Sequence, residues 1–220
     1  GITKTFGSVV ANDHINLEVR RGEILALLGE NGSGKTTLMN MISGIYHPDE
    51  GTIKINGKEV TINSPIDAGK LGIGMIHQHF KLVDVFSAMD NVAMGMEGKR
   101  VKPKELKEKL TKLTEKYGLE VEPEKKIYNM SVSEKQTVEI LKVLYRNADI
   151  LILDEPTAVL TPQETKKLFR ILRKMKEQGS AIIIITHKLN EVMEISDRVT
   201  ILRKGQSVET VNTSETNEKQ

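Results

Sequence analysis

Residues 29–36 read GENGSGKT and match the phosphate-binding pattern GxxxxGK[ST] in full. Glycines let a backbone fold around a phosphate with its N–H groups pointing inward, and a following helix presents its positive N-terminus to the same charge. Lys35 would reach the terminal phosphates, and the Thr36 hydroxyl would contact Mg²⁺. The candidate nucleotide-binding residues of this loop are Gly29, Asn31, Gly32, Ser33, Gly34, Lys35, Thr36 and Thr37.

The segments around this loop predict alternating strands and helices. Continuous apolar runs at Ile24–Leu28, Ile150–Leu153 and Ala181–Ile185 are typical of parallel strands that are buried on both faces. Between the last two runs, residues 161–164 (TPQE) form a capping box, and Gly179 is expected to end the helix. The pattern predicts an α/β fold with a mainly parallel core sheet.

Two further regions differ from this alternation. Residues Ile15–Val19 alternate apolar and polar, and residues 52–60 contain Asn56-Gly57, a strong two-residue hairpin signal. Both are expected to form antiparallel strands. Residues 102–117 place an apolar stripe on a charged helix, which predicts a helical insertion.

The amino-acid composition excludes several kinds of binding site and partner. Lys and Arg total 32 against 30 Asp and Glu, so the net charge of +2 gives no overall field that would attract nucleic acid or anionic lipid. Without cysteine, disulfides, thiolate metal sites and cysteine nucleophiles are excluded, and a cytosolic location is natural. The apolar runs are far shorter than the roughly 20 residues that span a bilayer. A start at Gly1 and a polar end at Gln220 suggest a fragment of a longer protein.

An acidic pair ends the second apolar run. Asp154 and Glu155 follow residues 150–153 directly, which would place both carboxylates at the carboxyl edge of a parallel sheet, where open α/β folds bind ligands. Asp154 is the candidate Mg²⁺ ligand. Glu155 is the candidate general base: in hydrolysis of a nucleoside triphosphate it would polarise the water that attacks the γ-phosphate.

The sequence DEPT at 154–157, followed by Thr186-His187, resembles the ATP-binding cassette (ABC) ATPase family over nearly the whole chain. The resemblance implies a P-loop nucleotidase that binds ATP and Mg²⁺. It gives Gln78 the role of linking the metal site to the helical insertion, His187 that of contacting the γ-phosphate, and Phe6 that of stacking on adenine. Residues 1–78 and 150–208 would form the catalytic core with an antiparallel β subdomain, 79–149 a helical subdomain, and 209–220 a linker or the start of a continuation.

The family's signature, LSGGQ followed by QR, should lie shortly before the acidic strand, where residues 130–137 read MSVSEKQT. Ser131 and Gln136 match, whereas Ser133 replaces a glycine and Thr137 a basic residue. The resemblance implies that this segment, including Ser131, Ser133 and Gln136, caps ATP held by a partner cassette. The departures predict slower turnover at that neighbouring site.

Within the family, residues 79–82, 145–149 and 157–164 most resemble the first half of tandem ATP-binding subunits of simple-sugar and nucleoside importers. This implies a second cassette in the parent chain, transmembrane permease subunits, an indirect role for a solute-binding protein, and a place at the cytoplasmic face of the membrane.

Two alternatives remain open. One is a soluble ABC protein that acts on ribosomes or nucleic acid, to which the lysine-rich segment Lys99–Lys116 could point. Glutamates alternate with these lysines at helical spacing and no aromatic side chains interleave them, so we expect a solvated helix and no nucleic-acid partner. The other is a regulatory cassette with little turnover.

Overall fold

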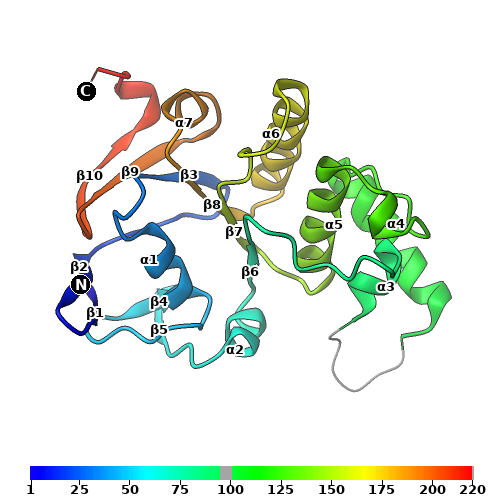
Figure 1. Cartoon of the computed structure of the whole chain (residues 1–220), viewed down its shortest axis with the longest axis horizontal. Coiled ribbons are helices and arrows are strands. Elements are labelled where there is room, and N and C mark those ends of the chain that lie inside the picture. Colours follow the sequence, from blue (N-terminus) through cyan, green and yellow to red (C-terminus); the bar gives the residue numbers. More distant parts are fainter. Residues whose placement is uncertain (95–100, 220) are drawn as a thin grey trace.

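The structure is a computed structural model that describes residues 1–94 and 101–219, so that Lys99 of the lysine-rich segment lies outside it. Its centre is a six-stranded sheet in the order β10-β9-β3-β8-β7-β6 (Figure 1). The strands are β3 (Glu23–Leu28), β6 (Ile73–Ile76), β7 (Ile150–Asp154), β8 (Ala181–Thr186), β9 (Arg198–Arg203) and β10 (Gln206–Asn212). Only β10 runs antiparallel to its neighbour. The predicted α/β fold with a mainly parallel core sheet is confirmed.

Both faces of the sheet are covered, as the continuous apolar runs predict. Successive side chains of a strand point to opposite faces. Leu151 and Leu153 of β7 pack in a core with helices α4 (Pro103–Tyr117), α5 (Val132–Tyr145) and α6 (Pro162–Glu177). Ile152, between them, packs in a second core with α1 (Lys35–Ile42) and α2 (Pro65–Lys70).

The remaining elements flank this framework. Two antiparallel hairpins, β1 (Ile2–Phe6) with β2 (Val9–Ile15) and β4 (Ile53–Ile55) with β5 (Lys58–Val60), lie near α1, and the second turns at Asn56-Gly57 as predicted (Figure 1). Helices α3 (Ala88–Ala93), α4 and α5 form a group at the other end of the molecule. Within residues 1–94 and 101–219, the remaining elements are helix α7 (Leu189–Ile195) and the 3₁₀ turns η1 (Ile127–Asn129) and η2 (Thr213–Glu215). No helix in residues 1–94 or 101–219 is long and apolar enough to cross a membrane.

Two expectations about extended segments are wrong. No strand runs over Ile15–Val19, because β2 spans Val9–Ile15 and ends where the expected strand begins. Leu17 and Val19 alternate with polar residues since both pack against the second core from a loop. The linker expected from residue 209 does not begin there, because β10 continues to Asn212 and the buried Thr213 follows in η2. As an edge strand, β10 exposes most of its side chains, so its composition resembles that of a linker.

Candidate functional site: a nucleotide pocket at the carboxyl edge of the sheet

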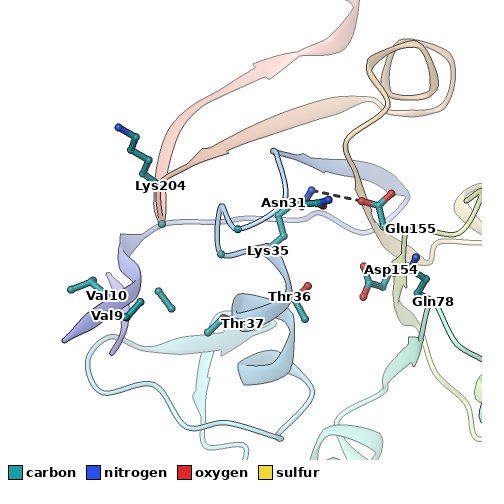
Figure 2. A pocket seen from close by; sticks show the side chains of 14 residues that line it. Val9, Val10, Asn31, Lys35, Thr36, Thr37, Gln78, Asp154, Glu155 and Lys204 are labelled. Atoms are coloured by element: carbon teal, nitrogen blue, oxygen red, sulfur yellow. Dashed lines mark ion pairs between the residues drawn. The ribbon is translucent and has the colours of Figure 1, made fainter. Parts of the chain in front are cut away.

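The parallel strands bring four predicted segments to one edge. Strands β3, β8, β7 and β6 are neighbours in that order, and their carboxyl ends lead into the phosphate loop, His187, the Asp154-Glu155 pair and Gln78. A cavity of about 490 Å³ lies there, and it is lined by Val9, Val10, Ala11, Asn31, Gly32, Gly34, Lys35, Thr36, Thr37, Gln78, Asp154, Glu155, Lys204 and Gly205 (Figure 2). Residues from distant parts of the sequence therefore share one pocket.

The phosphate loop depends on glycine where the backbone turns. Gly34 precedes α1 with φ +96°, a left-handed conformation, and a Cβ there would lie 2.5 Å from the Ala11 carbonyl oxygen. The Asn12 amide donates to the Gly34 carbonyl at 3.1 Å, and the Gly205 N–H donates to the Ser33 carbonyl at 3.0 Å. Strand β2 and the β9–β10 turn thus hold the loop against α1.

Lys35 is buried within this pocket and aimed at the loop. Its ammonium donates to the carbonyl oxygen of Gly29 and lies 3.7 Å from Glu155 Oε1, the ion pair drawn in Figure 2. Only 6% of the Lys35 side chain and 11% of the Glu155 side chain are exposed. A cation held at this position would meet the terminal phosphates of a nucleotide in the loop.

Glu155 directly follows β7 and lies beside the end of the neighbouring strand β8. Its backbone has φ +45°, which is uncommon for a residue other than glycine and concentrates at functional sites. The Glu155 N–H donates to the Ile185 carbonyl at 2.9 Å, and its Oε1 lies 2.9 Å from His187 Nδ1. The carboxylate is therefore fixed by backbone and side-chain contacts.

Three oxygen-bearing side chains could hold a divalent cation. The Thr36 hydroxyl, the Gln78 amide and the Asp154 carboxylate all line the pocket, and hard cations such as Mg²⁺ prefer these donor types. Burial raises the pKa of Asp154, the negative charge of Glu155 raises it further, and the charges of Lys35 and His79 oppose the rise. Among residues 1–94 and 101–219, no cluster of three or more His, Asp or Glu side chains could hold a metal alone. The donor set fits Mg²⁺ whose other ligands are phosphates and water.

Two buried polar atoms near the loop, Asn12 Oδ1 and Ser33 Oγ, have no hydrogen-bond partner in the described chain. A built Cβ on Gly29 would come within 2.5 Å of Ser33 Oγ, so the serine hydroxyl lies directly under the start of the loop. Unpaired buried polar atoms are rare and require an explanation. Their position beside the loop fits a polar ligand or water that binds there.

Other predicted residues lie outside this pocket. Phe6 is 43% exposed and does not line it, but pairs in register with Val9, which does. His187 also does not line it, but its Nδ1 lies 2.9 Å from Glu155 Oε1, which does. Val9, Val10, Ala11, Lys204 and Gly205 line the pocket although sequence reasoning missed them, and the only readable signal was the Lys204-Gly205 turn dipeptide.

The signature segment forms the N-terminus of α5, and its residues Val132 and Gln136 line a small cavity together with Gln78 and Glu155. Ser131 is the N-cap and accepts from Glu134 N at 3.2 Å, and Ser131 and Ser133 line a second cavity of about 700 Å³. Gln136 instead points inward: it is buried, and its Nε2 donates to the Pro156 carbonyl at 2.6 Å. Within this chain, Gln136 thus ties the signature helix to the segment after Glu155.

A phosphate loop, an acidic pair and a histidine at adjacent strand ends define a P-loop nucleotide-binding cassette. Residues 12–158 match the family model described as ABC transporter, and the chain belongs to this family. The predicted resemblance is confirmed.

Similar proteins extend this result. The chain is 53% identical over 213 residues to the nucleoside import ATP-binding protein NupA of Lactococcus lactis, covering 96% of this chain and 42% of that protein. It is 51% identical over 220 residues to the guanosine import ATP-binding protein NupO of Bacillus subtilis, covering 99% and 43%. The ADP conformation of MJ1267, an ATP-binding cassette of an ABC transporter, superposes with a TM-score of 0.88 at 26% identity over 97% of this chain and 89% of that one. The chain spans about two fifths of the length of these curated relatives.

Proposed function

We propose that this chain binds and hydrolyses ATP to drive an importer of nucleosides or simple sugars. The observation that carries the proposal is the joint placement of Lys35, Asp154 and Glu155 in one pocket beside the phosphate loop. The relatives named for nucleoside and guanosine import support the cargo class.

Each residue has a distinct part in the proposed reaction. Lys35 and the loop N–H groups bind the β- and γ-phosphates, and Phe6 stacks on the adenine. Glu155 accepts a proton from the attacking water, and His187 orients the Glu155 carboxylate and reaches toward the γ-phosphate. Thr36, Gln78 and Asp154 would hold Mg²⁺, which would neutralise charge that develops on the transferred phosphoryl group.

The proposed organisation follows the family pattern. Residues 1–78 and 150–208 serve as the catalytic core and 79–149 as a helical subdomain that passes movement to transmembrane permease subunits at the cytoplasmic face of the membrane. Gln78 leaves β6 where these two parts join. A second cassette, in the same parent chain, would supply the opposing signature, while Ser131 and Ser133 would cap its ATP. A solute-binding protein would deliver cargo without touching this chain.

The lysine-rich helix α4 supports this reading over nucleic-acid binding. Lys107 lies 3.7 Å from Glu124, and Lys109 donates to the Tyr145 carbonyl at 2.9 Å with its ammonium 4.2 Å from the Tyr145 ring centroid. These two cations are therefore engaged by the chain's own groups. We therefore propose that this chain does not bind nucleic acid.

The test compares the parent chain with Lys35→Ala by calorimetric titration and by thermal unfolding with and without Mg-ATP. A ligand that binds only the folded state, at a hundredfold excess over its Kd, adds about 2.7 kcal/mol to the free energy of unfolding. The parent should show this stabilisation and the variant should lose most of it. An equal response in the two proteins would refute the proposal.

A further inference from the structure

An aromatic pair lies beside the apolar end of the nucleotide pocket. The rings of Phe6, at the end of β1, and Tyr46, shortly after α1, have centroids 5.2 Å apart and planes inclined by 68°, an edge-to-face arrangement. The Lys4 ammonium lies 5.4 Å from the Phe6 ring centroid. Phe6 stays 43% exposed and Tyr46 38% exposed. Phe6 is thus braced by neighbours yet keeps surface free for a ligand.

Tyr46 is itself anchored to the phosphate-loop helix. The backbone N–H groups of Ile45 and Tyr46 both donate to the Asn40 carbonyl in α1, at 2.8 and 3.0 Å. Since α1 begins at Lys35, the position of Tyr46 follows that of the phosphate loop.

The same segment is tied to β1 just before Phe6. The Asp49 carboxylate accepts from the Thr5 N–H at 2.7 Å, from the Thr5 hydroxyl at 3.0 Å and from the Lys4 ammonium at 3.3 Å. Strand β1 is therefore held to the chain that leaves α1 by polar contacts at Asp49 and by the ring contact at Tyr46.

The pocket has two chemically different ends. Figure 2 shows Val9 and Val10 at one end, Asp154 and Gln78 at the other, and Lys35 and Thr37 between them. A triphosphate in the loop, with its metal at the carboxylate, leaves its base at the apolar end. Phe6 pairs with Val9 in the β1–β2 hairpin and so lies at that end.

We propose that Tyr46 is a positioning residue that holds the Phe6 ring at the distance from the phosphate loop that a nucleoside triphosphate requires. The inference rests on the proposed function, since it presumes that Phe6 stacks on the base of bound ATP. Through α1 and Tyr46, the elements that bind the phosphates also fix the surface that receives the base. Tyr46 acts through Phe6 and needs no contact with the nucleotide.

A role for Tyr46 in positioning Phe6 should affect the binding of one of two related ligands and not of the other. Mg-ATP uses the phosphate loop and Phe6, whereas inorganic triphosphate with Mg²⁺ has no base and uses the loop alone. An aromatic pair contributes enough that its removal changes an affinity by about two- to tenfold. Tyr46→Ala should raise the Kd of Mg-ATP within this range and leave that of Mg-triphosphate unchanged.

The experiment is isothermal titration of the full chain with each ligand. Tyr46→Phe keeps the ring and should restore the parent Kd for Mg-ATP. Tyr128→Ala removes a tyrosine that is 60% exposed in η1, and is the matched control expected to change neither Kd. In a Phe6→Ala background, Tyr46→Ala should cause no further loss, because its effect passes through the Phe6 ring.

The outcomes are distinct. An unchanged Kd for Mg-ATP in Tyr46→Ala, an equal loss for Mg-triphosphate, or an equal loss in the Phe6→Ala background would overturn the role of Tyr46. Retained triphosphate binding also shows that the variant is folded. If Lys35→Ala leaves both affinities intact, the proposed function itself fails, and the positioning role fails with it.

Discussion

His187 Nδ1 lies 2.9 Å from Glu155 Oε1, a contact that joins the residues following two adjacent parallel strands. Asp154 of β7 is in register with Ile185 of β8, so Glu155 lies level with Thr186, the residue directly before His187. The Lys35 ammonium lies 3.7 Å from the same Glu155 oxygen. One carboxylate oxygen thus connects the phosphate-binding cation with the histidine.

This relationship predicts that Glu155→Gln separates ATP binding from hydrolysis. The amide keeps the shape of the side chain but cannot accept a proton from water at neutral pH, and loss of general-base catalysis costs about 10²–10⁴-fold in rate. We expect hydrolysis to fall by at least about a hundredfold while the Kd for Mg-ATP stays within a few-fold of the parent value. Steady-state hydrolysis, measured with the membrane subunits proposed above present, and nucleotide titration give the two quantities.

Glu209→Gln, on the exposed side of β10, is the matched carboxylate control and should change neither quantity. Undiminished hydrolysis in Glu155→Gln would remove Glu155 from the catalytic role and favour another base. No hydrolysis by the parent, with tight Mg-ATP binding, would instead support a regulatory cassette.

A second prediction compares two glycines of the phosphate loop. Gly32 and Gly34 both have left-handed backbones, at φ +82° and +96°, but a Cβ at Gly32 has open space whereas one at Gly34 meets the Ala11 oxygen at 2.5 Å. Gly32→Ala should lower the free energy of unfolding by about 1 kcal/mol, from backbone strain alone. Gly34→Ala should cost about 3 kcal/mol or more, because strand β2 must also move. Equal urea midpoints for the two variants would show that the contact with β2 carries no cost.

The sequence predicted the elements whose signals are local. The runs that became β3, β7 and β8 were readable because parallel strands are apolar on both faces, and α6 was readable from its capping box, which the structure contains at Thr161 and Glu164. The strand ends then implied where Lys35, Asp154 and Glu155 meet.

Features that depend on tertiary contact were not predictable. Gly205 lines the pocket only because the β9–β10 turn folds back onto Ser33, some 170 residues away in sequence. The inward contact of Gln136 with the Pro156 carbonyl likewise requires α5 to pack beside β7. The sequence around Leu17 and Val19 has the pattern of a strand because a loop that packs against a core also alternates apolar and polar residues.

A third prediction concerns two arginine–carboxylate pairs of different burial. Arg198 Nε lies 2.5 Å from Glu23 Oε1, with only 14% and 8% of the side chains exposed, whereas Arg21 and Asp149 pair at 2.9 Å with 54% and 45% exposed. Arg198→Met leaves Glu23 buried without its cation and should cost about 3 kcal/mol of unfolding free energy. Arg21→Met should cost less than about 1 kcal/mol. Chemical denaturation measures both, and a similar loss in the two variants would contradict the argument from burial.

The last prediction concerns a buried carboxyl in α5. Glu139 is only 4% exposed, and its Oε1 accepts from the Lys81 N–H at 3.2 Å and lies 3.7 Å from the Lys142 ammonium. Burial raises the pKa of Glu139, and the charge of Lys142 opposes the rise only in part.

Because the folded-state pKa of Glu139 lies above its unfolded value of about 4.3, ionisation favours the unfolded chain. The contribution of Glu139 to stability is therefore full below the unfolded pKa and is lost as the pH rises through the folded pKa. Glu139→Gln keeps an oxygen that can accept from Lys81 but cannot ionise. The difference in Tm between variant and parent should shift in favour of the variant as the pH rises from about 4 to 7, whereas Glu209→Gln, on an exposed strand, should show no such shift. If the difference in Tm stays constant with pH, or shifts in favour of the parent, then the neighbouring lysines rather than burial determine the pKa of Glu139.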